Sequence, residues 1–212
     1  MNRTRVKICG ITREVDARAA INAGADAIGL VFYPKSPRYV EPLTAAKIVE
    51  EVEPFVTVVG LFVNAEASLV KEIITTVGLD LLQFHGDEDE VFCEQFGVPY
   101  IKAIRMSPGL DIKEVVRSKY PSARGFLFDA WNKDKYGGTG ETFEWQRLSS
   151  LKESADTDIP FILAGGLNPG NVNQAVAAVK PYAVDVSGGV EESPGIKSAA
   201  LIQQFIDRSN SR

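Results

Sequence analysis

Short apolar runs and segments of helical periodicity alternate along this chain. The apolar runs, which are typical of buried strands, cover residues 6–8, 27–32, 57–63, 81–84, 100–104, 125–128, 161–164 and 183–186. Between them, apolar residues recur at the spacing of an amphipathic helix, as in 45–52, 69–77 and 172–179, with a last helix around 202–206. The pattern predicts eight strands that alternate with eight helices.

Residues that favour helix starts follow several of these strands. Thr12 comes after the first strand, Asp87 and Glu90 have the spacing of a capping box, and Asn168 precedes a proline. We expect helices to begin at these positions.

Alternating strands and helices predict parallel strand pairing, because each crossover needs a helix. An open doubly wound sheet would fit the same alternation. Eight strand–helix units in 212 residues, with no linker and no low-complexity segment, favour a sheet that closes into a barrel. We therefore predict an α/β protein, a single-domain (β/α)8 TIM barrel that covers residues 1–212.

Composition and charge narrow the partners. A net charge of −5 argues against nucleic acid, which is bound by surplus Lys and Arg. No apolar run reaches the roughly 18 residues of a membrane span, and Lys7 interrupts the run that a signal peptide would need. The two cysteines, Cys9 and Cys93, match no disulfide framework or metal motif, so we expect a cytoplasmic protein. Nothing in the sequence indicates an oligomeric state.

Polar side chains stand at the ends of several predicted strands, where a barrel carries its catalytic groups. Because side chains alternate along a strand, Lys7 and Cys9 share one face of their strand. For the same reason Gln83 shares a face with His85, and Asp185 with Ser187. The set is Lys7, Cys9, Gln83, His85, Asp129, Asp185 and Ser187. Each has a plain alternative: a strand cysteine often fills a core, an aspartate often caps a helix, and a histidine can be structural.

Paired glycines follow the last two predicted strands, at Gly165-Gly166 and Gly188-Gly189. Glycine lets backbone N–H groups approach an anion, and the loops after strands 7 and 8 are the recurrent phosphate site of these barrels. Gly138 belongs to a third glycine cluster in the long loop 130–142, which is either a lid or simply a flexible surface loop.

Taken together, the motifs resemble those of the phosphoribosylanthranilate isomerase family across nearly the whole chain. The matching stretches, in order, are 7–12, 29–32, 36–38, 60–64, 83–88, 128–130, 137–140, 163–167 and 185–191. One departure is Gly188, where many members of the family have a second serine, so a hydroxyl contact to phosphate does not carry over to this position.

The resemblance implies a cofactor-free Amadori rearrangement of N-(5-phosphoribosyl)anthranilate to 1-(2-carboxyphenylamino)-1-deoxyribulose 5-phosphate in tryptophan biosynthesis. It implies Asp129 as general acid, Cys9 as general base and Arg38 as the partner of the anthranilate carboxylate. The remaining substrate contacts that we expect are Gln83, His85, Gly138, Gly165, Gly166, Ser187, Gly188 and Gly189.

Three further expectations concern charge at the barrel mouth. Lys7 and Asp185 should form an ion pair, because the first and last strands are neighbours and either charge alone is costly to bury. Lys7 should favour the thiolate of Cys9, which needs a modest downward shift of its pKa to act as a base. Asp129 should be shielded enough to hold a proton in the substrate complex.

Three other functions fit parts of the pattern. A histidine-pathway isomerase performs the same rearrangement on another aminoaldose, but that family resembles this chain with an aspartate in place of Cys9. A metal-dependent barrel hydrolase would need more ligands than one histidine offers. A non-catalytic phosphosugar-binding barrel would not need both Cys9 and Asp129.

Overall fold

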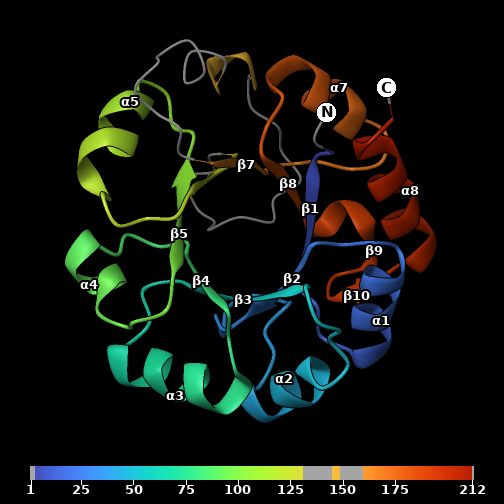
Figure 1. The fold of residues 1–212 in the computed structure, drawn as a ribbon, viewed down its shortest axis with the longest axis horizontal. Coiled ribbons are helices and arrows are strands. Elements are labelled where there is room, and N and C mark those ends of the chain that lie inside the picture. Colours follow the sequence, from blue (N-terminus) through green and yellow to red (C-terminus); the bar gives the residue numbers. More distant parts are fainter. Residues whose placement is uncertain (1–2, 131–144, 149–159, 212) are drawn as a thin grey trace.

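Eight parallel strands close into a barrel in the computed structural model, which describes residues 3–130, 145–148 and 160–211. Each strand pairs with its neighbour in the sequence, and the last pairs with the first (Figure 1). The strands are β1 (Arg5–Cys9), β2 (Ala27–Val31), β3 (Thr57–Phe62), β4 (Leu81–Phe84), β5 (Tyr100–Arg105), β6 (Phe126–Asp129), β7 (Phe161–Leu163) and β8 (Ala183–Val186). The predicted closed barrel is confirmed, and the open sheet is excluded.

Helices surround the barrel on its outer side (Figure 1). They are α1 (Glu14–Asn22), α2 (Pro42–Val49), α3 (Ala67–Val77), α4 (Glu90–Glu94), α5 (Ile112–Glu114) with the π-helical turn η1 (Val115–Lys119), α7 (Val172–Val179) and α8 (Ala199–Ser209). Between β6 and β7 the described part contains the 3-10 turn η2 (Trp145–Leu148). Within the described ranges, no helix has the length and apolar character needed to cross a bilayer.

Alternation along the strands divides the core into two layers. Outward-facing side chains such as Phe62, Phe84 and Phe128 pack against the helices and are fully buried. Smaller inward-facing residues fill the barrel interior, among them Ala103 and Leu127. The interior is therefore packed, and polar groups gather only at its mouth.

The predicted helix starts are wrong by a few residues at all three positions. Thr12 caps no helix, because its hydroxyl donates to the Gly195 carbonyl at 2.5 Å. The fourth helix is capped by Asp89, whose carboxylate accepts from Phe92 N–H at 2.8 Å. The helix after β7 begins at Val172, because the Asn168 side chain forms a turn with Gly170 instead.

A small hairpin between β8 and α8 was not predicted. After the 3-10 turn η3 (Gly188–Val190), β9 (Glu191–Ser193) pairs antiparallel with β10 (Ile196–Lys197). It lies beside α1, at the edge of the barrel (Figure 1). Such short strands bury too few apolar positions to leave a periodic signal in the sequence.

Candidate active site

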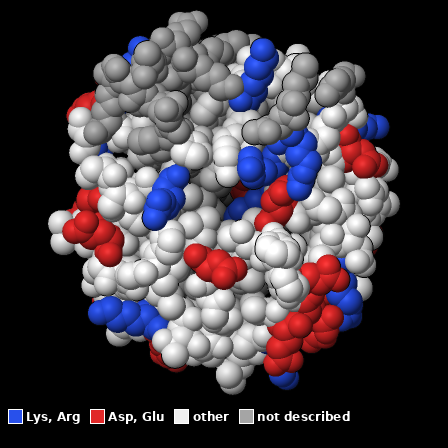
Figure 2. Space-filling model, viewed as in Figure 1, with Lys and Arg blue, Asp and Glu red and all other residues white. Residues whose placement is uncertain are grey.

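A cavity of about 200 Å³ opens where the loops after β7 and β8 meet the end of β6. Its lining includes Asp129, Asp185 and most of the predicted substrate contacts, namely Gly165, Gly166, Ser187, Gly188 and Gly189. The molecule is hollowed at its centre in the same view as the barrel, and basic and acidic side chains gather there (Figure 2). Gly138 and most of the loop 130–142 lie outside the described residues.

The two glycine loops are packed directly against each other. A Cβ atom on Gly189 would lie only 1.9 Å from the Leu167 carbonyl oxygen, so this contact requires glycine. On the opposite loop, Asn168 and Asn171 both donate side-chain N–H groups to the Gly166 carbonyl, at 3.3 and 3.0 Å. The loops therefore form a preorganised backbone surface at the cavity.

Cys9 lies beside the ion pair that was predicted between β1 and β8. Lys7 Nζ is 2.7 Å from Asp185 Oδ1, and both side chains are buried, which confirms that prediction. Gly29 on the neighbouring strand makes room for this arrangement: a Cβ there would be 2.8 Å from Cys9 Sγ and 3.1 Å from Lys7 Nζ. Cys9, Lys7 and Asp185 thus form one contiguous group.

Burial determines the proton affinity of this thiol. Desolvation raises the pKa of Cys9, and the Lys7 ammonium opposes it without reversing the shift. Lys7 favours the thiolate, as predicted, but the downward shift of the Cys9 pKa that a base needs is absent, because burial outweighs the effect of Lys7. Burial also disfavours the Lys7 ammonium, but Asp185 and Cys9 hold the pKa of Lys7 above its usual value.

Asp129, His85 and Gln83 form a second polar group across the mouth. The Gln83 amide nitrogen is 3.0 Å from His85 Nδ1, so with this nitrogen donating, the ring proton lies on Nε2. Nε2 is 3.2 Å from Asp129 Oδ2, an ion pair if the ring is protonated, whereas in the described part of the chain neither Nε2 nor Gln83 Oε1 has a hydrogen-bond partner. Two buried polar atoms are thus available to a bound molecule.

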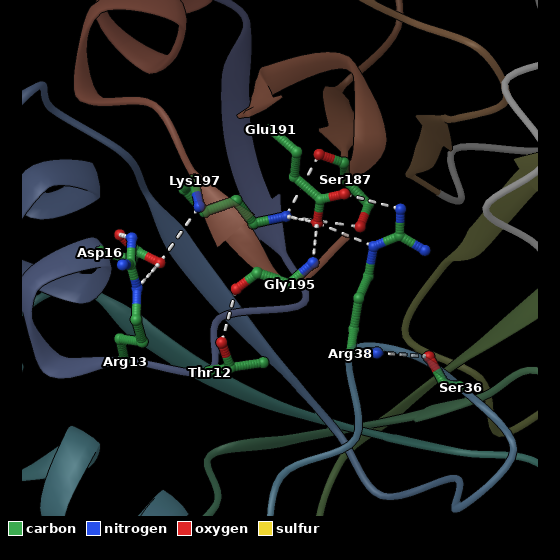
Figure 3. Close-up of polar contacts among 9 residues, drawn as sticks. All are labelled: Thr12, Arg13, Asp16, Ser36, Arg38, Ser187, Glu191, Gly195 and Lys197. Carbon is green, nitrogen blue, oxygen red and sulfur yellow. Dashed lines mark hydrogen bonds and ion pairs between the residues drawn. The ribbon is translucent and has the colours of Figure 1, made fainter. Parts of the chain in front are cut away.

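Arg38 reaches the loop after β8 from the loop after β2 (Figure 3). Its Nε and one terminal nitrogen, Nη2, donate to the two carboxylate oxygens of Glu191, each at 2.8 Å. Glu191 also accepts from Lys197 Nζ at 2.8 Å. In the ranges that the structure describes, no cluster of three His, Cys, Asp or Glu side chains is placed to bind a metal ion.

Sequence and structure comparisons identify the relatives of this chain. A sequence profile described as N-(5'-phosphoribosyl)anthranilate (PRA) isomerase matches residues 6–208. The chain belongs to this isomerase family.

The similarity extends over whole chains. An N-(5'-phosphoribosyl)anthranilate isomerase of Pseudomonas aeruginosa is 55% identical over 212 residues, which is 100% of this chain and 98% of the relative. One of Nitrosococcus oceani is 54% identical over 204 residues, 96% of each chain. The crystal structure of phosphoribosyl anthranilate isomerase from Thermotoga maritima superposes with a TM-score of 0.86 at 38% identity, covering 97% of this chain and 98% of that one.

Membership of the phosphoribosylanthranilate isomerase family makes this chain an aldose–ketose isomerase of tryptophan biosynthesis that acts on a small molecule. A further family structure is a complex with reduced 1-(o-carboxyphenylamino)-1-deoxyribulose 5-phosphate, with a TM-score of 0.82 and 38% identity over 97% of this chain and 98% of that one.

Sequence reasoning missed three residues of the site. Gly29 and Glu191 lie within motifs that matched the isomerase family, but the sequence does not show that Gly29 makes room for Cys9 or that Glu191 pairs with Arg38. Lys197 lies in the unpredicted hairpin, and a lone lysine there gives no signal.

Proposed function

We propose that Cys9 and Asp129 carry the family's Amadori rearrangement of N-(5'-phosphoribosyl)anthranilate in this chain. The observation that supports this most directly is the common cavity: Asp129 and the two glycine loops line it together with Asp185, the partner of Lys7 beside Cys9. A sugar anchored by its phosphate at the glycine loops would therefore extend between an acid and a base.

The phosphate is bound by backbone N–H groups of the loops that contain Gly165, Gly166, Ser187, Gly188 and Gly189. Such N–H groups suit an anion because they donate without a desolvated countercharge. Gly188 contributes no hydroxyl, so the backbone carries more of this binding than a serine at that position would require.

Asp129 acts first, as the general acid. It protonates the ring oxygen while the nitrogen lone pair opens the furanose to an iminium ion. The Asp129 side chain is 10% exposed and accepts a hydrogen bond from the Ala130 N–H at 2.8 Å. Further burial by the substrate favours the neutral acid that this step needs.

Cys9 acts second, as the general base. Its thiolate removes the proton from the sugar carbon next to the iminium, and the resulting enolamine ketonises. The positive charge of the iminium adds to that of Lys7 and favours the thiolate at the moment when it is needed. This offsets the burial that raises the pKa of Cys9 in the free protein.

Arg38 binds the anthranilate carboxylate, for which a planar guanidinium offers paired donors. Gln83 and His85 contact the sugar or the aromatic ring through Gln83 Oε1 and His85 Nε2, which lack hydrogen-bond partners in the described chain. We further propose a single functional unit over residues 1–212 and, from the two free buried thiols, a cytoplasmic setting without nucleic-acid or membrane partners.

Two other functions remain distinguishable by experiment. The first is weak turnover of the histidine-pathway aminoaldose. Cys9 disfavours it, because the histidine-pathway isomerases resemble this chain but have an aspartate at the position of Cys9. A phosphosugar-binding protein without chemistry is disfavoured because the groups around Cys9 and Asp129 are both intact.

The deciding experiment follows the loss of anthranilate-type fluorescence when the protein meets freshly prepared N-(5'-phosphoribosyl)anthranilate. We expect turnover without added metal, reduced about a hundred- to ten-thousandfold in Cys9→Ser and in Asp129→Asn. Activity that survives either change would refute the role of that residue. Binding of inorganic phosphate without turnover would favour the binding protein.

A further inference from the structure

The β9–β10 hairpin places two buried charged residues, Glu191 and Lys197, directly behind Arg38 (Figure 3). Neither has a role in the acid–base steps. The Lys197 side chain is fully buried. Burying an ammonium group costs free energy unless the group is paired and hydrogen-bonded, and here Glu191 is its partner.

The Arg38 guanidinium has two edges that can each hold a carboxylate. Glu191 takes the edge formed by Nε and Nη2, with both hydrogen bonds at 2.8 Å. In the described chain, no group accepts a hydrogen bond from Nη1, so no carboxylate of these residues takes the second edge. A second carboxylate therefore finds a bidentate donor pair already oriented.

Glu191 is held in place by hydrogen bonds besides those from Arg38. It accepts from Lys197 Nζ at 2.8 Å and from the Gly195 N–H at 3.3 Å. Lys197 Nζ in turn donates to the Ser187 carbonyl at 3.1 Å. Burial favours the neutral acid, but these hydrogen bonds from Arg38 and Lys197 hold the pKa of Glu191 below its usual value.

The hairpin itself is tied to the loop after β1 and to α1. The Thr12 hydroxyl donates to the Gly195 carbonyl at 2.5 Å, and the Lys197 N–H donates to Asp16 Oδ2 at 3.2 Å. Figure 3 shows these contacts on the side of Glu191 away from Arg38. The carboxylate is thus part of a rigid support.

Charge and space both favour an additional carboxylate. Among the residues that the structure describes, Arg38 and Lys197 both pair with the carboxylate of Glu191, so these three groups together carry one surplus positive charge. Gly188 supplies the room: a Cβ there would lie 3.1 Å from Arg38 Nη2. A larger side chain at this position would approach the guanidinium closely.

We propose that Glu191, supported by Lys197, is a positioning residue that turns the second edge of Arg38 toward the substrate carboxylate and so selects carboxylate-bearing aminoaldoses. The proposal rests on the assignment of Arg38 in the proposed function. It adds a reason for specificity, because an aminoaldose without a carboxylate leaves the surplus charge unmatched.

The test compares two ligands on one set of variants by titration calorimetry. The first ligand is reduced 1-(o-carboxyphenylamino)-1-deoxyribulose 5-phosphate, and the second is the same molecule without its carboxyl group. We expect Glu191→Gln to weaken binding of the first ligand by about ten- to a hundredfold and binding of the second by less than about twofold. In turnover, KM should rise while kcat changes little.

Glu51→Gln is the matched control, because Glu51 also pairs with an arginine, Arg18, but lies on the outer surface. It should change neither affinity. If Glu191→Gln does not fold, Glu191→Asp provides the same comparison, because it keeps the charge but draws the carboxylate back from Arg38; the loss should again be larger for the carboxylate ligand.

Equal losses for both ligands would show a merely structural role and overturn the proposal. Tighter binding of the first ligand would also overturn it, since Glu191 would then compete with substrate for Arg38. A wild-type protein that turns over substrate but binds both ligands equally would refute the assignment of Arg38 itself. No turnover at all would refute the proposed function.

Discussion

Two buried lysine–carboxylate pairs lie on opposite faces of the barrel wall and differ in how completely they are satisfied. Lys102 alternates with inward-facing Ala103 and so points to the helix layer, where Nζ donates to Glu88 at 2.9 Å and to the Gly86 and Phe84 carbonyls at 2.7 and 3.3 Å. Glu88 also accepts from the N–H groups of Asn64 and Gly86, at 2.7 and 2.9 Å.

The pair at the mouth is less complete. Lys7 Nζ has one carboxylate partner, Asp185, at 2.7 Å, and the thiol of Cys9 beside it. Asp185 lines the cavity, whereas Glu88 has a side chain only 2% exposed and ties the loop after β4 in place. The Lys102–Glu88 pair, with its many hydrogen bonds, therefore stabilises the fold. The Lys7–Asp185 pair makes fewer hydrogen bonds, lies beside a thiol and is suited to a role in the reaction.

Replacing Lys102 gives the largest expected effect. Lys102→Met leaves Glu88 charged and buried, so the free energy of unfolding should fall by about 3–5 kcal/mol. Urea denaturation followed by circular dichroism measures it. Adding Glu88→Gln should recover part of the loss; a single variant as stable as wild type would remove the contrast between the two pairs.

Replacing Lys7 should instead reduce activity more than stability. Lys7→Met removes the cation that favours the Cys9 thiolate, so kcat/KM near neutral pH should fall about ten- to a hundredfold. The free energy of unfolding should change by only about 1–3 kcal/mol, because water in the cavity can reach Asp185. A protein with full activity would show that Lys7 has no influence on the base.

The pH profile sharpens the same contrast. Because burial raises the pKa of Cys9, the thiolate population of the free enzyme still grows above the ordinary thiol range. We expect the ultraviolet absorbance of the Cys9 thiolate to grow only above the ordinary thiol range, and in Lys7→Met to grow at still higher pH. Difference spectra against Cys9→Ser over a pH series measure it, and a Cys9 thiolate already complete at pH 7 would contradict it.

Gly29→Ala should have the smallest effect. The added methyl group would approach Cys9 Sγ and Lys7 Nζ, and the lysine end can move by a few tenths of an ångström. A reduction of about three- to tenfold in kcat, with KM unchanged, follows from misplacing the base. Gly78→Ala serves as the comparison, since a Cβ there meets nothing within 4 Å, although its φ of +74° costs some stability.

The barrel could be predicted from sequence because its strands are buried on both faces and leave continuous apolar runs. The groups at strand ends followed from alternation, as for Lys7 and Asp185. The β9–β10 hairpin escaped because it makes its contacts through polar atoms, which leave no period. The partners of Arg38 escaped for a related reason: Glu191 lies 153 positions away and only the closed fold brings the two together.

The contact of β1 with β8 makes the site dependent on the whole chain. Lys7 and Asp185 are 178 residues apart, and both glycine loops belong to the last third of the sequence. A chain that lacks its final strands lacks Asp185, the partner of Lys7, and also lacks both glycine loops to which we assign phosphate binding. Enzymatic competence therefore arrives only with barrel closure, so recovery of turnover during refolding would report the final docking step rather than the formation of individual βα units.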